Sequence, residues 1–119
     1  MKKTLYGIPN CDTVKKARTW LSEHAHEFDF HDFKKQGLER ATAAAWLDQL
    51  DWEVLVNRKG TTWRKLSDEQ RAAITGKDAA LALMLEQPSV IKRPVLDLGG
   101  RYSVGFSADQ YAQLLGAAK

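Results

Sequence analysis

The chain has 119 residues, of which 44% are hydrophobic and 28% are charged, and its formal net charge is +3. This length favours one domain over residues 1–119, and the single cysteine excludes an internal disulfide. No apolar run approaches the roughly 20 residues that span a bilayer. The N-terminus also has too short an apolar stretch for a signal peptide. We therefore expect a cytoplasmic monomer with no membrane partner.

The 18 Lys and Arg residues slightly outnumber the 15 Asp and Glu residues. They are interleaved with acids, as in DFKKQGLER and WRKLSDEQR, and no run of five or more basic residues occurs. This pattern favours a mildly basic surface, or a local site for a small anion, and we expect no nucleic-acid partner.

The first third of the chain predicts a βαβ unit. Residues 3–8 resemble a short buried strand bounded by Gly7 and Pro9. A helical pattern begins at Asp12, with apolar residues recurring on one face. Residues 27–33 alternate as in a second strand. A strand, a helix and a strand within about 30 residues favour a parallel pair with a right-handed crossover.

The middle of the chain predicts helices. Residues 41–50 are good helix formers, whereas residues 52–57 fit either a helical turn or a strand. Residues 57–66 predict a polar connection centred on Gly60. A further helix is expected to begin with a capping box between Ser67 and Gln70. Residues 77–87 predict a largely buried helix that ends at Pro88.

The last third of the chain predicts two strands and a helix. Residues 89–98 and 100–106 flank a Gly-Gly turn, as in an antiparallel hairpin. The sequence of residues 107–119 is typical of a helix that begins with a capping box between Ser107 and Gln110 and with a hydrophobic staple between the residues at 106 and 111. The whole order is βαβ…ββα. It predicts an α/β protein with a thioredoxin-like mixed sheet and a helical lobe inserted at about 38–87.

A lone cysteine in such a protein is usually a small buried hydrophobe without chemistry. Cys11, however, lies in the turn between the first strand and the first helix, at or next to the N-cap. Free backbone N–H groups and the helix dipole favour an anion there, and a thiol so placed ionises more readily. The neighbouring residues Asn10, Asp12 and Thr13 then become candidate binding residues. Asn10 is the expected helix cap, and Thr13 is expected to assist it.

Arginines elsewhere in the chain are candidates to supply positive charge to the thiol. Arg58 precedes Gly60, with Lys59 beside it, and Arg93 precedes Pro94. Because proline cannot donate to a sheet ladder, Pro94 should begin a strand rather than interrupt one.

Three segments, GIPNCDTVKKA, LVNRKGTTWRKL and QPSVIKRPVL, resemble in order and spacing the arsenate reductase (ArsC)/Spx family, and most of all its YffB-like branch. The resemblance covers roughly residues 4–115 and implies a thioredoxin-like fold with a helical insertion. By this resemblance Cys11 is the nucleophile, Arg58 and Arg93 bind an oxyanion beside it, and Pro94 is a cis-proline.

This chain departs from the pattern of the arsenate enzymes at two positions. Val104 stands where they carry a third anion-binding arginine, although Arg101 is near in sequence, and Gly7 stands where they carry a histidine. Both changes weaken a site for a doubly charged oxyanion and leave thiol chemistry intact. Spx regulators carry Cys-x-x-Cys, whereas Val14 stands at the second cysteine position here, so an internal disulfide switch is excluded.

These features together predict a glutathione-dependent thiol reductase with no bound cofactor, which uses glutathione as co-substrate. Arsenate reduction is a further activity to test. The expected partners are glutathione, glutaredoxin and a small oxyanion or thiol substrate. Arg58, Arg93 and Lys59 are expected to pair with the glutathione carboxylates.

Two alternatives stay open. A non-catalytic, Spx-like protein would bind RNA polymerase instead of turning over a substrate. A metal site is less favoured, because His24 and His26 are expected on different faces of a helix end and no residue set completes a zinc pattern with His31. The tryptophans are interpreted mainly as core residues, with Trp63 as a candidate to line the site.

Overall fold

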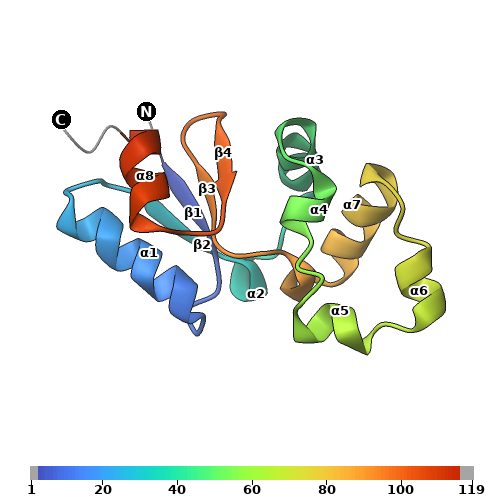
Figure 1. Cartoon of the computed structure of the whole chain (residues 1–119). Coiled ribbons are helices and arrows are strands. Elements are labelled where there is room, and N and C mark those ends of the chain that lie inside the picture. The colour runs from blue at the N-terminus through green and yellow to red at the C-terminus, as the bar shows by residue number, and fades with distance from the viewer. Residues whose placement is uncertain (1–2, 116–119) are drawn as a thin grey trace. The chain divides into compact units, whose positions relative to one another are not determined.

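The computed structural model describes residues 3–115. They form two compact units, one from residues up to 35 together with those from 93 onward, and the other from residues 36–92. Figure 1 shows the elements in chain order, which are β1 (Thr4–Gly7), α1 (Asp12–Glu23), β2 (Asp29–Asp32), α2 (Phe33–Gln36), α3 (Arg40–Gln49), α4 (Trp52–Leu55), α5 (Thr61–Lys65), α6 (Asp68–Ala72), α7 (Lys77–Glu86), the 3₁₀ helix η1 (Pro88–Val90), β3 (Val95–Asp97), β4 (Tyr102–Val104) and α8 (Ala108–Leu115).

The sheet of the first unit has the order β2-β1-β3-β4. β1 runs parallel to β2, with Leu5 opposite Phe30, and antiparallel to β3, with Leu5 opposite Leu96. β3 and β4 form an antiparallel hairpin. The predicted βαβ unit, the hairpin and the mixed thioredoxin-like sheet are therefore confirmed.

The core of this unit lies on one face of the sheet, under α1 and α8 (Figure 1). Leu5 and Leu96 point to this face from neighbouring strands, because side chains opposite each other in a ladder share a face. The helices contribute apolar residues to the same cluster, which includes Val14, Ala17, Trp20, Leu21 and Tyr111. The apolar period of the N-terminal helix, read from the sequence, therefore matches the face that packs on the sheet.

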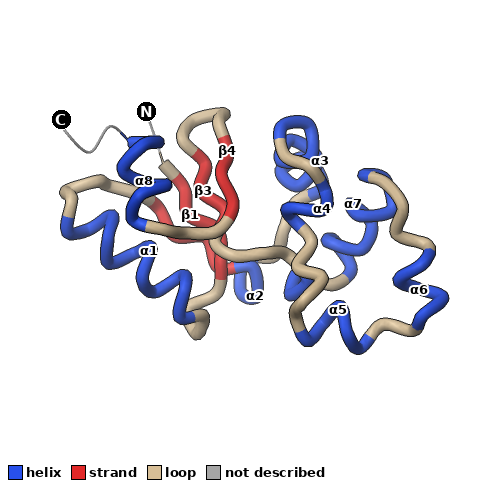
Figure 2. Tube along the Cα trace, viewed as in Figure 1, coloured by secondary structure: helices blue, strands red, loops and turns tan. Residues whose placement is uncertain are grey.

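The second unit is helical, as Figure 2 shows by the absence of red strand segments among its described residues. α3 packs against α7, and the buried side chains include Trp46 and Met84. Residues 52–57, whose sequence fits either a helical turn or a strand, form first a helical turn and then a single strand-like bridge. Residues Trp52–Leu55 make the turn α4, and Val56 then forms an isolated antiparallel bridge with Ile91.

Three predicted boundaries are wrong. Residues 89–98 are not one strand: η1 follows Pro88, and β3 begins only after Pro94, because the proline has no N–H for the ladder. The connection at 57–66 contains the short helix α5. The second strand ends at Asp32, whose Oδ1 accepts a hydrogen bond from Lys34 N (2.9 Å) and so starts α2 instead.

Local capping signals were more reliable. Ser67 and Gln70 form the predicted reciprocal capping box at α6. At α8 only half of the box forms, because Ser107 Oγ accepts from Gln110 N while the Gln110 side chain donates to Val104 O. The staple is present, with the rings of Phe106 and Tyr111 4.7 Å apart. Residues 116–119 of the predicted helix lie outside the described residues.

Among the described residues, no helix combines the length and the apolar character needed to cross a membrane.

Candidate active site

Cys11 is the N-cap residue of α1, with extended backbone angles of φ −90° and ψ 124°. Its carbonyl accepts the first helical bond from Lys15 N (2.9 Å), and its own N–H donates to Ile8 O (3.4 Å). The residue is partly buried and packs against the core cluster. The lone thiol therefore stands at the start of a twelve-residue helix, where backbone N–H groups are unpaired and favour an anion.

The prediction that Asn10 caps this helix is wrong. The Cys11 N–Ile8 O bond closes a four-residue turn in which Pro9 and Asn10 hold the two central positions, as proline commonly does in a β-turn. Asn10 is exposed and belongs to the turn, and the side chain of the actual cap, Cys11, makes no cap hydrogen bond. Asp12 is the first helical residue and is exposed, and Thr13, the next, is half-buried.

Arg93 and Pro94 lie at the edge of the sheet where the chain leaves β1 toward Cys11. Their peptide bond is cis, as the family resemblance implied. Pro94 is buried, and its carbonyl accepts a hydrogen bond from Gly105 N (2.8 Å). Arg93 is half-buried, with a buried Nε. Because β1 and β3 are antiparallel neighbours, the loop that leaves β1 toward Cys11 and the segment that enters β3 lie at one edge.

Arg58 and Lys59 belong to the helical unit, in the turn between α4 and α5. Arg58 Nη1 lies 3.4 Å from Glu53 Oε2, and both side chains are 49% exposed. The guanidinium carbon also lies 5.7 Å from the centre of the Trp52 ring. Lys59 is exposed, and its N–H donates to Asn57 Oδ1 (3.2 Å).

The two departures from the arsenate-enzyme pattern also have positions in the structure. Val104 pairs with Val95 and so lies at the Cys11 edge of the sheet, where it offers no charge. Arg101 lies in the loop between β3 and β4, at the other end of these strands, and cannot replace a cation at this edge. A Cβ built on Gly7 would lie 2.8 Å from Val14 Cγ2, so a side chain at that position would collide with the buried core.

A family model described as the ArsC family matches residues 6–114. The chain belongs to the ArsC family. This confirms the resemblance inferred from the three sequence segments. Solved structures agree: a YFFB protein is 52% identical, with a TM-score of 0.90 over 94% of this chain and 97% of that one. An arsenate reductase (ArsC) related protein from Brucella melitensis is 48% identical, with a TM-score of 0.77 over 97% and 95% of the two chains.

Curated relatives of this ArsC-family chain carry two kinds of name. A Haemophilus influenzae protein named only as uncharacterized is 44% identical over 108 residues, which cover 91% of this chain and 94% of that one. The global transcriptional regulator Spx of Streptococcus pyogenes is 27% identical over 94% of this chain and 84% of its own. An arsenate reductase structure from Vibrio cholerae, at 17% identity and a TM-score of 0.81 over 95% and 97% of the chains, shows the shared fold.

The histidines of this ArsC-family member pack on aromatic rings. The expectation that His24 and His26 face apart is wrong, since both stack on Trp20, with ring centres 3.9 Å and 5.8 Å away. The helix ends at this point and Ala25 has a φ of 58°, so helical spacing no longer applies. Burial, followed by the charges of Lys3 and His24, lowers the pKa of His26. Within residues 3–115, no group of three or more His, Cys, Asp or Glu side chains could hold a metal ion.

Sequence patterns missed two acidic residues near the candidate site residues. Asp32 is buried at the end of β2, opposite Gly7, and so lies at the Cys11 edge of the sheet. The sequence signal for Asp32 was an acidic residue on the side of the predicted second strand that was expected to be buried. Glu53, the partner of Arg58, gave no signal, because its five-residue separation from Arg58 does not correspond to a helical or strand neighbour.

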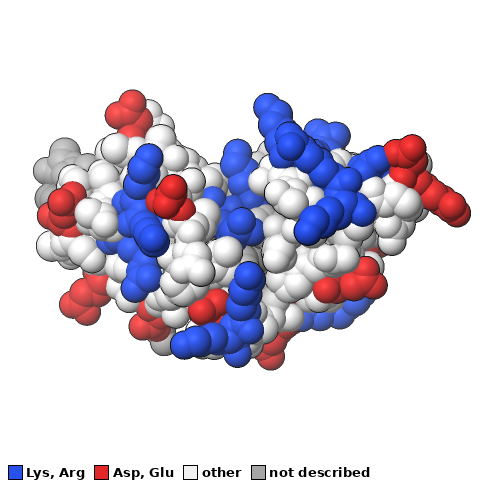
Figure 3. Space-filling model, turned by 90° about the horizontal axis from the view of Figure 1, so that it is seen from below, with Lys and Arg blue, Asp and Glu red and all other residues white. Residues whose placement is uncertain are grey.

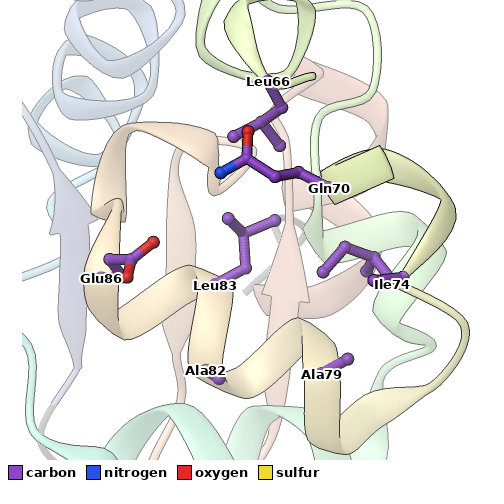
Figure 4. Close-up of a pocket in the computed structure, with 8 residues that line it drawn as sticks. Leu66, Gln70, Ile74, Ala79, Ala82, Leu83 and Glu86 are labelled. Carbon is purple, nitrogen blue, oxygen red and sulfur yellow. The ribbon is translucent and has the colours of Figure 1, made fainter. Parts of the chain in front are cut away.

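The helical unit of this ArsC-family chain also contains a cavity of about 290 Å³. Figure 4 shows Leu83 and Ile74 pointing into it, with Gln70 above them and Glu86 at one side. None of the predicted site residues lines it. Half-buried Trp63 does not line it either. On the face that Figure 3 displays, Lys and Arg side chains are interspersed with Asp and Glu side chains.

Proposed function

We propose that this ArsC-family chain is a glutathione-dependent thiol reductase whose nucleophile is the Cys11 thiolate. The observation that carries the proposal is the position of Cys11 as the N-cap of α1, partly exposed, at the sheet edge where Arg93 and Pro94 enter β3. The N–H groups of the first helical turn and the helix dipole favour a negative sulfur at that position.

The chemistry requires an external thiol, because the chain has one cysteine. The Cys11 thiolate attacks the glutathione sulfur of a mixed disulfide, a new S–S bond forms, and the substrate leaves as a thiolate. A second glutathione thiolate then attacks the glutathione sulfur bound to Cys11. Oxidised glutathione leaves, and the Cys11 thiolate is restored. In the net reaction one glutathione thiol is consumed, its proton ends on the released substrate thiol, and its sulfur joins the glutathione sulfur of the mixed disulfide as oxidised glutathione.

Glutathione carries two carboxylates, and the proposal assigns the cationic residues to them. The half-buried Arg93 is the first candidate because it precedes Pro94 at the Cys11 edge. Arg58 is included on the strength of the family resemblance, and Lys59 because it follows Arg58 in the chain and adds a second positive charge. A guanidinium binds a carboxylate with two parallel hydrogen bonds, which a lysine cannot do.

The test is turnover of a glutathione mixed disulfide by the parent chain and by Cys11→Ser. We expect the serine variant to lose turnover entirely while keeping its helical circular dichroism. Arg93→Ala should raise the KM for glutathione, and Arg101→Ala is the matched control, because that arginine lies at the opposite edge of the sheet. Turnover by Cys11→Ser at the parental rate would refute the proposal.

Arsenate is the second substrate class to test, since similar structures are named as arsenate reductases or as related to them. The uncharged Val104 at the Cys11 edge weakens the case for a doubly charged oxyanion. Arsenate reduction coupled to glutathione, with or without glutaredoxin, is therefore expected to be slower than disulfide reduction. A faster rate with arsenate would reverse this order.

A non-catalytic role is the second candidate function, because the curated relatives include proteins named as the transcriptional regulator Spx. In that case the chain would bind RNA polymerase and show no turnover. A pull-down with the polymerase α subunit, run beside the disulfide assay on the same preparation, separates the two functions.

A further inference from the structure

The turn that carries Arg58 is held by hydrogen bonds within the turn and to η1. Asn57 N donates to Val90 O (2.8 Å), and Gly60 N donates to Asn57 O (3.2 Å). The Asn57 side chain accepts from Lys59 N, and a Cβ built on Gly60 would lie 2.8 Å from Asn57 Nδ2. These hydrogen bonds hold the backbone on both sides of Arg58, so the position of its charge depends mainly on the side-chain rotamer.

The neighbouring helix α4 presents two groups to the Arg58 side chain. Asp51 Oδ1 accepts from Glu53 N (3.0 Å) and caps this helix, which fixes the backbone of Glu53. The Glu53 carboxylate lies 3.4 Å from the guanidinium, and the Trp52 ring lies within cation–π distance of it. The Arg58 charge is thus paired with a carboxylate of its own chain.

We propose that Glu53 is a positioning residue that tunes the affinity of the anion site: its carboxylate holds Arg58 until a carboxylate of the ligand displaces it. The inference rests on the proposed function, in which Arg58 binds glutathione. A guanidinium that must give up one carboxylate to accept another gains only the difference between the two interactions. Every anion that binds through this guanidinium is weakened by the same factor, and a ligand carboxylate overcomes the competition best because it binds through two parallel hydrogen bonds.

The size of the effect follows from the exposure of the pair. Both side chains are about half exposed, and an exposed ion pair of this kind raises the dissociation constant of a ligand that must break it by no more than about fivefold. Removing the Glu53 charge should therefore tighten anion binding by about two- to fivefold at low salt. At about 1 M salt the difference should become smaller, because the Debye length is then about 3 Å, similar to the 3.4 Å that separates the two charged groups.

The probe is S-methylglutathione, which keeps both carboxylates of glutathione and has no free thiol. Its dissociation constant is measured by NMR titration of the full chain, with Cys11 intact. Glu53→Gln should bind about two- to fivefold more tightly than the parent. Asp48→Asn is the matched control: it makes the same change of charge in another exposed ion pair, Lys77–Asp48, also at 3.4 Å, and should leave binding unchanged.

Arg58→Ala separates the possible failures. If Arg58→Ala weakens binding and Glu53→Gln behaves like Asp48→Asn, the inference about Glu53 is wrong and the anion role of Arg58 stands. If Arg58→Ala binds as well as the parent, the proposed role of Arg58 fails and the inference fails with it. The double variant Glu53→Gln/Arg58→Ala should bind like Arg58→Ala alone, because Glu53 acts only through Arg58.

Discussion

Tyr6 and Val95 stand opposite each other in the antiparallel pairing of β1 with β3. Tyr6 is followed five residues later by Cys11, and Val95 is preceded directly by Pro94 and Arg93. This one register position is the reason that segments more than 80 residues apart in the sequence share an edge of the sheet. A shift of the register by one residue would turn the side chains of β3 to the other face and break up this arrangement.

Gly7 should not tolerate a side chain. Its Cβ would lie 2.8 Å from Val14 Cγ2, and Val14 is fully buried and stiff about χ1. We expect Gly7→Ala to lower the free energy of unfolding by about 1–3 kcal/mol, the usual cost of overpacking. Urea denaturation followed by circular dichroism measures this.

The matched control is Gly76→Ala, because a Cβ built on Gly76 meets no atom within 4 Å. This change creates no clash, and its expected cost is limited to the preference for glycine over alanine at the N-cap of α7, below about 1 kcal/mol. Adding Val14→Ala to Gly7→Ala should recover part of the steric loss. If Gly7→Ala and Gly76→Ala are equally stable, the close approach of β1 to α1 is not as the structure has it.

Arg71 should stabilise the end of α5. Its Nη1 donates to the carbonyls of Arg64 (3.1 Å) and Leu66 (2.5 Å), and its Nη2 contacts Asp68. Arg71→Gln removes the charge and the fork of donors, and should cost about 1–3 kcal/mol of unfolding free energy. Arg64→Gln, which changes an exposed arginine in the same region, should cost less than about 0.5 kcal/mol. Equal losses would contradict the assigned role.

Asp97 should fix the β3–β4 turn. Its Oδ1 accepts from Gly99 N (2.8 Å) and Gly100 N (2.9 Å), and both glycines have positive φ angles. Asp97→Ala should therefore lower the unfolding free energy by about 1–2 kcal/mol, whereas Asp97→Asn keeps an acceptor and should lose less. A smaller loss for the alanine variant than for the asparagine variant would rule this out.

The same carboxylate acts on Tyr102, which stands opposite it in the hairpin. Burial and, second, the charge of Asp97 raise the pKa of Tyr102. Asp97→Asn removes the second cause, so the Tyr102 pKa should fall toward its ordinary value of about 10. NMR titration of the ring signals in the parent and the variant measures the change, and an unchanged pKa would exclude the charge as a cause.

Tyr111 should make the chain sensitive to alkali. Burial raises the pKa of Tyr111, whose hydroxyl is buried and has no hydrogen-bond partner among residues 3–115. The folded state therefore holds this proton more tightly than the unfolded state. The stability it contributes is complete below about pH 10, the ordinary tyrosine pKa, and is lost as the pH rises toward the folded pKa.

Tyr111→Phe keeps the ring contacts with Phe106 and Trp20 and removes the proton. At pH 7 the variant should be as stable as the parent or more stable, because no hydrogen bond is lost. Between pH 10 and pH 11 the unfolding free energy of the parent should fall more steeply than that of the variant. Parallel pH profiles would show that Tyr111 does not titrate on unfolding.

Sequence patterns were informative wherever the deciding contact is local. The capping box of Ser67 and Gln70 and the staple of Phe106 and Tyr111 join residues three to five positions apart, so their spacing alone predicts them. The cap at Cys11 was misassigned although it is also local. Asparagine is a residue type that often caps helices, but Asn10 occupies a central position of the turn that the Cys11 N–Ile8 O hydrogen bond closes.

The sequence by itself determined that the chain has a βαβ start, a helical middle, a ββα end and one thiol at a helix N-terminus, because periodicity and capping are properties of neighbouring residues. Only the tertiary structure decided that Arg93 and Pro94 enter the sheet at the Cys11 edge, that Arg101 lies at the far end of its hairpin, and that Glu53 holds Arg58. Strand register and side-chain pairing depend on how distant segments pack, and no local pattern encodes them.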